Sequence, residues 1–243
     1  MQPVKKILIP IPDKDFDTTE VALAWEIFKK NHFQIVFATE HGKVGETDPL
    51  LLSGVIFGQL GAKKNAIAAY HEMQKSGEFL NPITYFHIKP QEFDLLYLPG
   101  GHAKGMRQYL ESKVLQDKIV EFFKLNKLIG SVCHGTLVMA RSLDPATGKS
   151  IVYDYTISGL PKSLEMLAYG LTSWKLGDYY KTYPEYLQDE VERLLKSKKQ
   201  FKTGVSSFIP FVVEDRNLTC ARWPNDVEKL ANRLVERLKS VQH

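Results

Sequence analysis

The stretch LIGSVCHG, residues 128–135, decides the expected fold. Its first five residues are mostly apolar and predict a short buried strand, and a helix is expected to begin around Gly135. Small residues stand two positions before and two positions after Cys133, as a sharp strand-to-helix turn requires where the two backbones come close together. The stretch therefore predicts that Cys133 lies on a strained, exposed turn at the carboxyl end of a strand.

A second glycine-rich turn follows another predicted strand. Residues 93–98 (FDLLYL) are mostly apolar, and Pro99-Gly100-Gly101-His102 comes directly after them. The other elements in this half of the chain are strands expected at 7–12 and 34–39 and helices expected from Glu20 and over 114–123. Such alternation predicts a mainly parallel sheet with right-handed crossovers, in which the turns that follow the strands share one edge.

Two longer segments interrupt this alternation. Residues 50–88 form an insertion, expected to be helical around 66–74, and residues 162–200 form a helical segment at the rim of the sheet, called the cap segment below. The remaining elements are strands expected at 152–158, 206–213 and 218–222 and a closing helix over 224–238. We expect residues 1–243 to form a single α/β domain, a flavodoxin-like three-layer sandwich with a mainly parallel sheet, a nucleophile elbow and a small helical cap.

The composition is that of an ordinary globular chain. Hydrophobic residues make up 44% and charged residues 25% of the 243 residues, and the net charge of +4 is too small to indicate nucleic-acid binding. No run approaches the roughly 18 apolar residues of a membrane span, and the first twelve residues, broken by prolines, predict a strand and not a signal peptide. We therefore expect a cytoplasmic protein with neither a nucleic-acid nor a membrane partner.

Cys133 is the candidate reactive group. A helix N-terminus and an adjacent imidazolium favour a thiolate, so we expect a depressed pKa and faster alkylation by iodoacetamide at Cys133 than at Cys220. Cys220 lies within the predicted strand LTCAR and is expected to be a packing residue, and the same packing role is the alternative for Cys133. The backbone N–H groups of His134 and Gly101 are the expected oxyanion-hole donors, and a plain turn is the alternative for Gly101.

Three motifs together resemble a known family: LYLPGGH at 96–102, IGSVCHG at 129–135, and Glu20 on the first helix. Residues 5–28 and 211–238 match the opening and closing elements of the same family. The sequence is similar to the ThiJ/PfpI superfamily of class I glutamine amidotransferase-like proteins, and it is nearest the chaperone/glyoxalase III-like branch. The resemblance covers nearly the whole chain and favours a homodimer.

The resemblance implies a role for four side chains. Cys133 matches the reactive elbow cysteine, and Glu20 matches the acid that hydrogen-bonds it and shuttles a proton; we expect Glu20 to be protonated near neutral pH. His134 matches the histidine beside the elbow. Glu165, in the segment GLPKSLE, matches the acid that completes a triad by hydrogen-bonding one His134 ring nitrogen while the other faces the sulfur. The alternatives are a solvated Glu165, and proton transfer by Glu20 alone with His134 contributing mainly its backbone N–H.

Members of the family are associated with glutathione-independent glyoxalase, deglycation, peptidase, isonitrile hydration and holdase activities. We expect a cofactor-independent glyoxalase that converts methylglyoxal to lactate, or a related enzyme that detoxifies small aldehydes or other electrophiles. The alternatives are a cysteine hydrolase or peptidase that uses the triad, and a redox sensor or stress holdase in which Cys133 is oxidised. The adjacent positions of Cys133 and His134 argue against a glutaminase. No cofactor and no metal are expected, because the His-and-carboxylate metal site of the glyoxalase-like branch finds no match in this sequence.

Overall fold

The central sheet has seven strands in the order β5-β3-β1-β6-β7-β9-β8. The computed structural model describes residues 4–56 and 58–240, so residue 57 of the predicted insertion and both ends of the predicted domain, 1–3 and 241–243, lie outside the described residues. In the order of the sheet, the strands are Ile83–Thr84, Gln34–Thr39, Lys6–Pro10, Leu95–Leu98, Leu128–Val132, Leu218–Ala221 and Val212–Asp215. All neighbouring strands pair in parallel except β8 and β9, which are antiparallel. The prediction of a mainly parallel sheet is confirmed.

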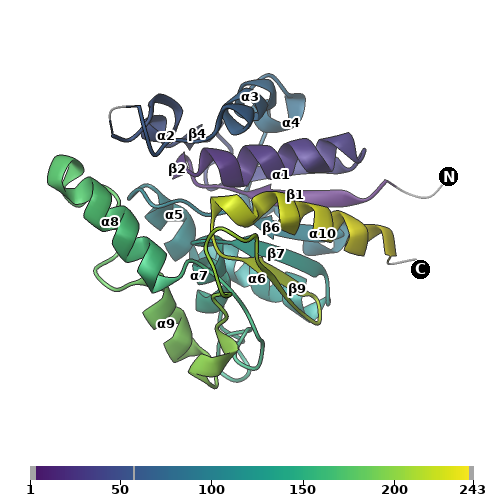
Figure 1. The fold of residues 1–243 in the computed structure, drawn as a ribbon. Coiled ribbons are helices and arrows are strands. Elements are labelled where there is room, and N and C mark those ends of the chain that lie inside the picture. The colour runs from purple at the N-terminus through teal and green to yellow at the C-terminus, as the bar shows by residue number, and fades with distance from the viewer. Residues whose placement is uncertain (1–3, 57, 241–243) are drawn as a thin grey trace.

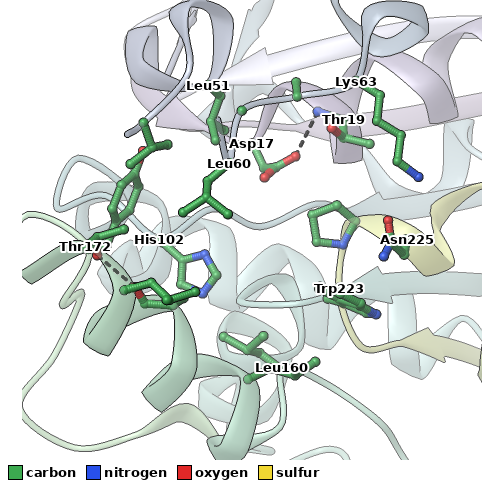
Figure 2. Close-up of a pocket in the computed structure, with 18 of the residues that line it drawn as sticks. Asp17, Thr19, Leu51, Leu60, Lys63, His102, Leu160, Thr172, Trp223 and Asn225 are labelled. Carbon is green, nitrogen blue, oxygen red and sulfur yellow. Dashed lines mark hydrogen bonds between the residues drawn. The ribbon is translucent and has the colours of Figure 1, made fainter. Parts of the chain in front are cut away.

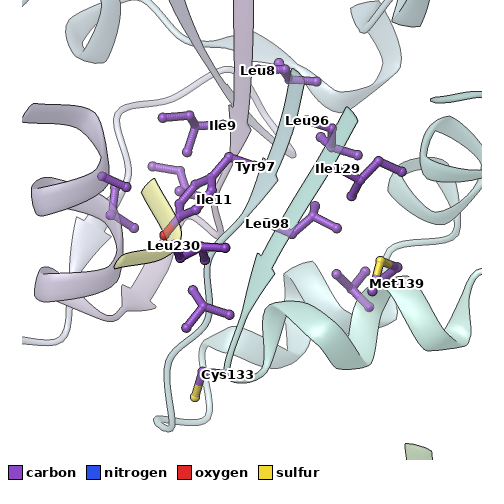
Figure 3. Close-up of a cluster of buried hydrophobic side chains, with 14 of the residues drawn as sticks. Leu8, Ile9, Ile11, Leu96, Tyr97, Leu98, Ile129, Cys133, Met139 and Leu230 are labelled. Atoms are coloured by element: carbon purple, nitrogen blue, oxygen red, sulfur yellow. The ribbon is translucent and has the colours of Figure 1, made fainter. Parts of the chain in front are cut away.

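Helices cover both faces of this sheet (Figure 1). On one face α1 (Thr18–Lys30) packs beside α10 (Val227–Ser240), and on the other lie α6 (Lys113–Lys124) and α7 (Gly135–Arg141). Side chains of β6 alternate between the two layers, because successive residues of a strand point to opposite faces. In Figure 3, Tyr97 lies on the side of α1, and Leu98 lies on the side of α7 together with Met139. The three-layer α/β architecture is therefore confirmed.

Helices of the insertion and of the cap segment project from one end of the sheet. α8 (Lys162–Leu176), α9 (Leu187–Leu194) and α2 (Pro49–Ser53) lie at the end of the molecule opposite the two chain termini (Figure 1). The remaining elements are β2 (Lys14–Phe16), β4 (Glu46–Thr47), α3 (Lys64–Met73), α4 (Gly77–Leu80), α5 (Met106–Glu111) and the 3-10 turns Tyr85–His87, Pro90–Glu92, Lys198–Gln200 and Pro224–Asp226. Among the described helices, none combines the length and apolar character that crossing a bilayer requires.

Two of the predicted strands differ from the structure. The prediction of a strand at 152–158 is wrong, because this segment consists mainly of turns and irregular structure. Only Ile157 forms a β-bridge, an isolated one to Phe201. The strand expected at 206–213 begins only at Val212. Residues 152–158 form local turn hydrogen bonds and, at Ile157, two backbone hydrogen bonds to Gln200 and Lys202, which do not continue into a ladder.

A buried arginine explains the late start of β8. The Arg222 side chain is 1% exposed, and its guanidinium donates to three backbone carbonyl oxygens within residues 203–209 at 2.8–2.9 Å. It also forms a bidentate pair with Asp226 at 2.8 and 2.9 Å. Because these carbonyl groups point at Arg222, they are unavailable to a neighbouring strand, and the chain bends there. The buried pair thus fixes the loop that leads into the edge hairpin.

We predict that Arg222→Ala lowers the free energy of unfolding by about 3–5 kcal/mol, because it leaves the Asp226 carboxylate buried without its partner. Arg193→Ala is the matched control, since Arg193 forms a bidentate pair with Glu185 on the surface, with 61% of the Arg193 side chain exposed. That substitution is expected to cost less than about 1 kcal/mol. Urea denaturation followed by circular dichroism measures both, and equal losses would contradict the structural role of Arg222.

Candidate active site

Cys133 lies at the junction of β7 and α7, as the sequence predicts. Its φ of 54° places it in the left-handed region, which a non-glycine residue adopts only when its surroundings hold it there. The turn after β6 and the turn after β7 leave no room for a side chain where they meet. A Cβ at Gly135 would lie 2.0 Å from the Leu98 carbonyl oxygen, and one at Gly100 would lie 2.6 Å from the His134 nitrogen. The two glycine-rich turns therefore lie together at the ends of the adjacent strands β6 and β7.

The first helix presents Glu20 to this junction. Asp17 caps α1, with its Oδ1 accepting from the Thr19 and Glu20 N–H groups at 2.8 and 3.0 Å, while its own N–H donates to the Gly100 carbonyl oxygen at 2.9 Å. The Gly100 N–H in turn donates to Glu20 Oε2 at 2.7 Å. Glu20 is completely buried, and its other oxygen, Oε1, has no nitrogen or oxygen partner among the described residues. The Cys133 side chain lies beside the same carboxyl group, because a Cβ at Gly100 would be 3.0 Å from both Cys133 Cβ and Glu20 Oε2.

Burial dominates the electrostatics of the pair. It raises the pKa of the Glu20 carboxyl well above its usual range, and the neighbouring Asp17 raises it further. The direction agrees with the expectation of a protonated Glu20. Burial also raises the pKa of the Cys133 thiol, with Glu20 and Asp17 as additional causes, although the His134 backbone N–H stabilises the thiolate. The expectations of an exposed cysteine with a depressed pKa are therefore wrong, because Cys133 is only 1% exposed and faces carboxyl groups.

His134 lies between the cysteine and the predicted acid of the triad. Its Nδ1 is 3.6 Å from Cys133 Sγ, and its Nε2 is 3.8 Å from Glu165 Oε1. The second distance is too long for a hydrogen bond, so the predicted bond between Glu165 and His134 is not formed in this arrangement. Burial lowers the pKa of His134 well below its usual value and raises that of Glu165 to about 7. The imidazole is therefore neutral, and the pair is not an ion pair at neutral pH.

Glu165 also serves the local structure of the cap segment. It lies in the first turn of α8, and its Oε2 accepts from the Leu187 N–H at the start of α9 at 2.9 Å. The elbow is tied to the chain just before α8 because Thr136 Oγ1 donates to the Ser158 carbonyl oxygen at 2.9 Å. The structure thus brings together all four predicted side chains, Cys133, Glu20, His134 and Glu165, and their catalytic roles stay predictions, as does the Gly101 oxyanion donor.

The comparison with known sequences agrees with this geometry. A sequence profile described as ThiJ/PfpI family-like matches residues 11–204. The chain belongs to the ThiJ/PfpI family. An uncharacterized protein of Schizosaccharomyces pombe is 30% identical over 145 residues, covering 56% of this chain and 54% of that protein, so the match spans about half the length of this relative.

Further relatives carry names that indicate an activity. A putative glutathione-independent glyoxalase of Schizosaccharomyces pombe is 19% identical over 225 residues, covering 87% of this chain and 79% of that protein. The crystal structure of glyoxalase III from Candida albicans superposes with a TM-score of 0.71 at 18% identity and covers 96% of each chain. This structural likeness confirms the fold that the ThiJ/PfpI resemblance implied.

His102 is a further residue of the site, and the sequence patterns did not predict it. Its ring lies 5.1 Å from that of His134, and its buried Nε2 has no hydrogen-bond partner among the described residues. Burial lowers the pKa of His102 to about 4, which keeps the ring neutral. Figure 2 shows the ring facing a cavity of about 420 Å³, bounded also by Asp17, Thr19 and Leu160. The sequence contains a feature that could have identified His102, because this residue directly follows the glycine pair of the turn after β6.

One set of possible metal ligands coincides with this ThiJ/PfpI site. The ligand atoms of His102, Cys133 and His134 lie within 4.8 Å of one another, and no other such group of three was found in the described ranges. One thiolate and two imidazoles are donors that zinc accepts, and an ion there would occupy the cysteine sulfur. The expectation that the protein uses no metal stays a prediction.

We predict that Glu20→Gln shifts the alkylation of Cys133 to lower pH. At the alkaline pH where the thiol ionises, Glu20 is already charged, and its removal takes away the largest charge that raises the thiol pKa. The measurement is the rate of iodoacetamide labelling of the Cys133 peptide against pH, followed by mass spectrometry. Glu26→Gln, on the same helix but outside the site, is the control and leaves the profile in place. An unchanged profile in Glu20→Gln would show that the two groups do not interact.

Proposed function

We propose that this protein is a cofactor-independent glyoxalase that converts methylglyoxal, or a related 2-oxoaldehyde, to the 2-hydroxy acid. The observation that carries the proposal is the buried pair of Cys133 and Glu20, in which burial raises the pKa of both groups. The neutral His134 ring, 3.6 Å from the sulfur, supplies a proton acceptor. The names of the glyoxalase relatives support the same reaction.

The first step is addition of the thiol to the aldehyde. Cys133 Sγ forms a bond to the aldehyde carbon as its proton passes to the neutral imidazole of His134, and the C=O π electrons move to the oxygen. Glu20 gives its carboxyl proton to that oxygen, so that the product is a neutral hemithioacetal facing a carboxylate. The N–H groups of Gly101 and His134 are the proposed donors to the oxygen while it is negative.

The next steps move a proton between the two carbons. The Glu20 carboxylate removes the hydrogen of the former aldehyde carbon, and the electron pair forms an enediolate whose oxygen is protonated by the His134 imidazolium. Glu20 then returns the proton to the adjacent carbon while His134 takes the proton of the first hydroxyl group, which leaves a thioester of the hydroxy acid. Water cleaves this thioester, one water proton restores Glu20, and His134 returns its proton to the sulfur. The sum is methylglyoxal plus water giving lactic acid.

The triad hydrolase receives less support from the same geometry. A hydrolytic triad needs an acid that orients the imidazole and stabilises its charged form. Glu165 lies 3.8 Å from His134 Nε2, already accepts a backbone N–H, and has its pKa raised to about 7 by burial. Glu20, in contrast, belongs to the same hydrogen-bonded junction as the cysteine turn. We therefore assign the proton transfer to Glu20 and His134.

We predict that Cys133→Ala and Glu20→Gln both abolish lactate formation from methylglyoxal in the absence of glutathione. For Glu20→Gln the expected loss in kcat is about 10²–10⁴-fold, the range of general acid–base catalysis. Glu165→Gln is expected to cost less than about tenfold, because the amide oxygen can still accept the Leu187 N–H. Lactate is measured enzymatically, and circular dichroism confirms that each variant is folded.

The other outcomes of this experiment identify the alternatives. A loss of kcat in Glu165→Gln as large as that in Glu20→Gln would show that Glu165 acts in a catalytic triad. Turnover of peptides that depends on Cys133 would indicate a hydrolase. A gain in mass of the Cys133 peptide with peroxide, without turnover of any aldehyde, would indicate a redox sensor and overturn the glyoxalase proposal.

A further inference from the structure

The cavity beside the reactive pair is larger and more apolar than a three-carbon substrate requires. Its volume of about 420 Å³ lies within the range of small-molecule sites, about 300–1,000 Å³. Its walls are mainly apolar, and the apolar side chains include Leu51 and Leu60 of the insertion, Leu167 and Leu171 of the cap segment, Leu160 just before it, and Trp223 after β9. Methylglyoxal bound at the sulfur would leave most of this surface in contact with water.

His102 is the lining residue of the cavity that lies next to the cysteine. A ligand nitrogen of His102 lies within 4.8 Å of Cys133 Sγ, although Cys133 itself does not line the cavity. Asp17 and Thr19, from the same helix start as Glu20, line the adjoining wall (Figure 2). A substituent on a carbonyl carbon bonded to the sulfur would reach the cavity by passing His102.

The charged lining residues lie away from the apolar walls or are already hydrogen-bonded. Asp17 Oδ1 accepts two backbone N–H groups, and Lys63 and Glu228 are exposed to solvent at the mouth. On the apolar side, Leu60 and Leu167 remain 53% and 55% exposed although they line the same hollow. An apolar occupant removes these side chains from water, whereas a charged one gains no fixed partner deep in the cavity.

We infer that the preferred substrate is a 2-oxoaldehyde that carries an apolar chain or ring, which lies in this cavity while the aldehyde reaches Cys133. The inference rests on the proposed glyoxalase function for the reaction itself, but the binding site for the apolar group stands on the cavity alone. Each methylene of the chain buried against these walls strengthens binding about fourfold, until the chain fills the cavity.

Binding is tested first, without any chemistry. Isothermal titration calorimetry of Cys133→Ser with 2-alkanones from acetone to 2-nonanone measures affinity against chain length. We expect a rise of about fourfold per methylene and a negative heat-capacity change, the signature of apolar burial. Ala168→Trp, which fills the cavity from α8, and Leu171→Asn, at a half-exposed position, flatten this rise. Met166→Trp is the control, because Met166 is exposed on the same helix and does not line the cavity.

Turnover separates this inference from the proposed function. With wild-type protein, hexylglyoxal and phenylglyoxal are expected to exceed methylglyoxal in kcat/KM by more than tenfold, and Met166→Trp keeps that preference. If ketone affinity rises with chain length but no glyoxal is turned over, the proposed glyoxalase function is wrong and the proposed apolar binding site is supported. Turnover of methylglyoxal with ketone affinities that do not depend on chain length, or that fall equally in Met166→Trp, would overturn the apolar site and leave the glyoxalase.

Discussion

The hydrogen bond from the Gly100 N–H to the buried Glu20 carboxyl is the interaction on which the site depends. At 2.7 Å it ties the first helix to the turn after β6, and the elbow after β7 packs against the same turn so closely that no Cβ fits at Gly100. Three segments of the chain, around residues 20, 100 and 133, therefore share one small volume. Loss of the bond would leave both the Gly100 N–H and a carboxyl oxygen buried without partners, which the fold tolerates poorly.

This enclosure determines the protonation of the site. Burial opposes every charge: it raises the pKa of the Glu20 carboxyl and of the Cys133 thiol, and it lowers the pKa of His102 and His134. In the proposed reaction the thiol, the acid and the imidazole exchange protons inside this buried site, where the Glu20 carboxylate and the His134 imidazolium form together. That arrangement favours a reaction in which a proton moves between adjacent carbons. It does not favour a stable thiolate that reacts directly with an electrophile or an oxidant.

The sequence predicted the parts of the structure that local patterns determine. The apolar runs of β3 and β7 and the spacing of small residues around Cys133 identify the strands and the elbow, because both depend on near neighbours in the chain. The missing strand at 152–158 and the late β8 could not be predicted this way, since the second depends on Arg222, which reaches back to residues 203–209. The raised pKa of Cys133 was not predicted for the same reason. The helix start and His134, which favour a thiolate, are neighbours in the sequence, whereas burial and the Glu20 carboxyl, which raise the pKa, depend on distant parts of the chain.

In the proposed enzyme, chemistry and substrate size are set by different parts of this chain. The reactive groups Cys133 and Glu20 lie at the ends of core elements and are fixed by backbone contacts that a substitution cannot alter without disturbing the sheet. The apolar walls of the cavity come instead from the insertion, the cap segment and the loop after β9, whose half-exposed leucines carry little of the core packing. Those walls can change from one relative to another while the reactive pair stays in place, which is how a single fold serves several substrates. The low identity between this chain and its glyoxalase relatives is therefore compatible with shared chemistry at the sulfur and a different group accepted beside it.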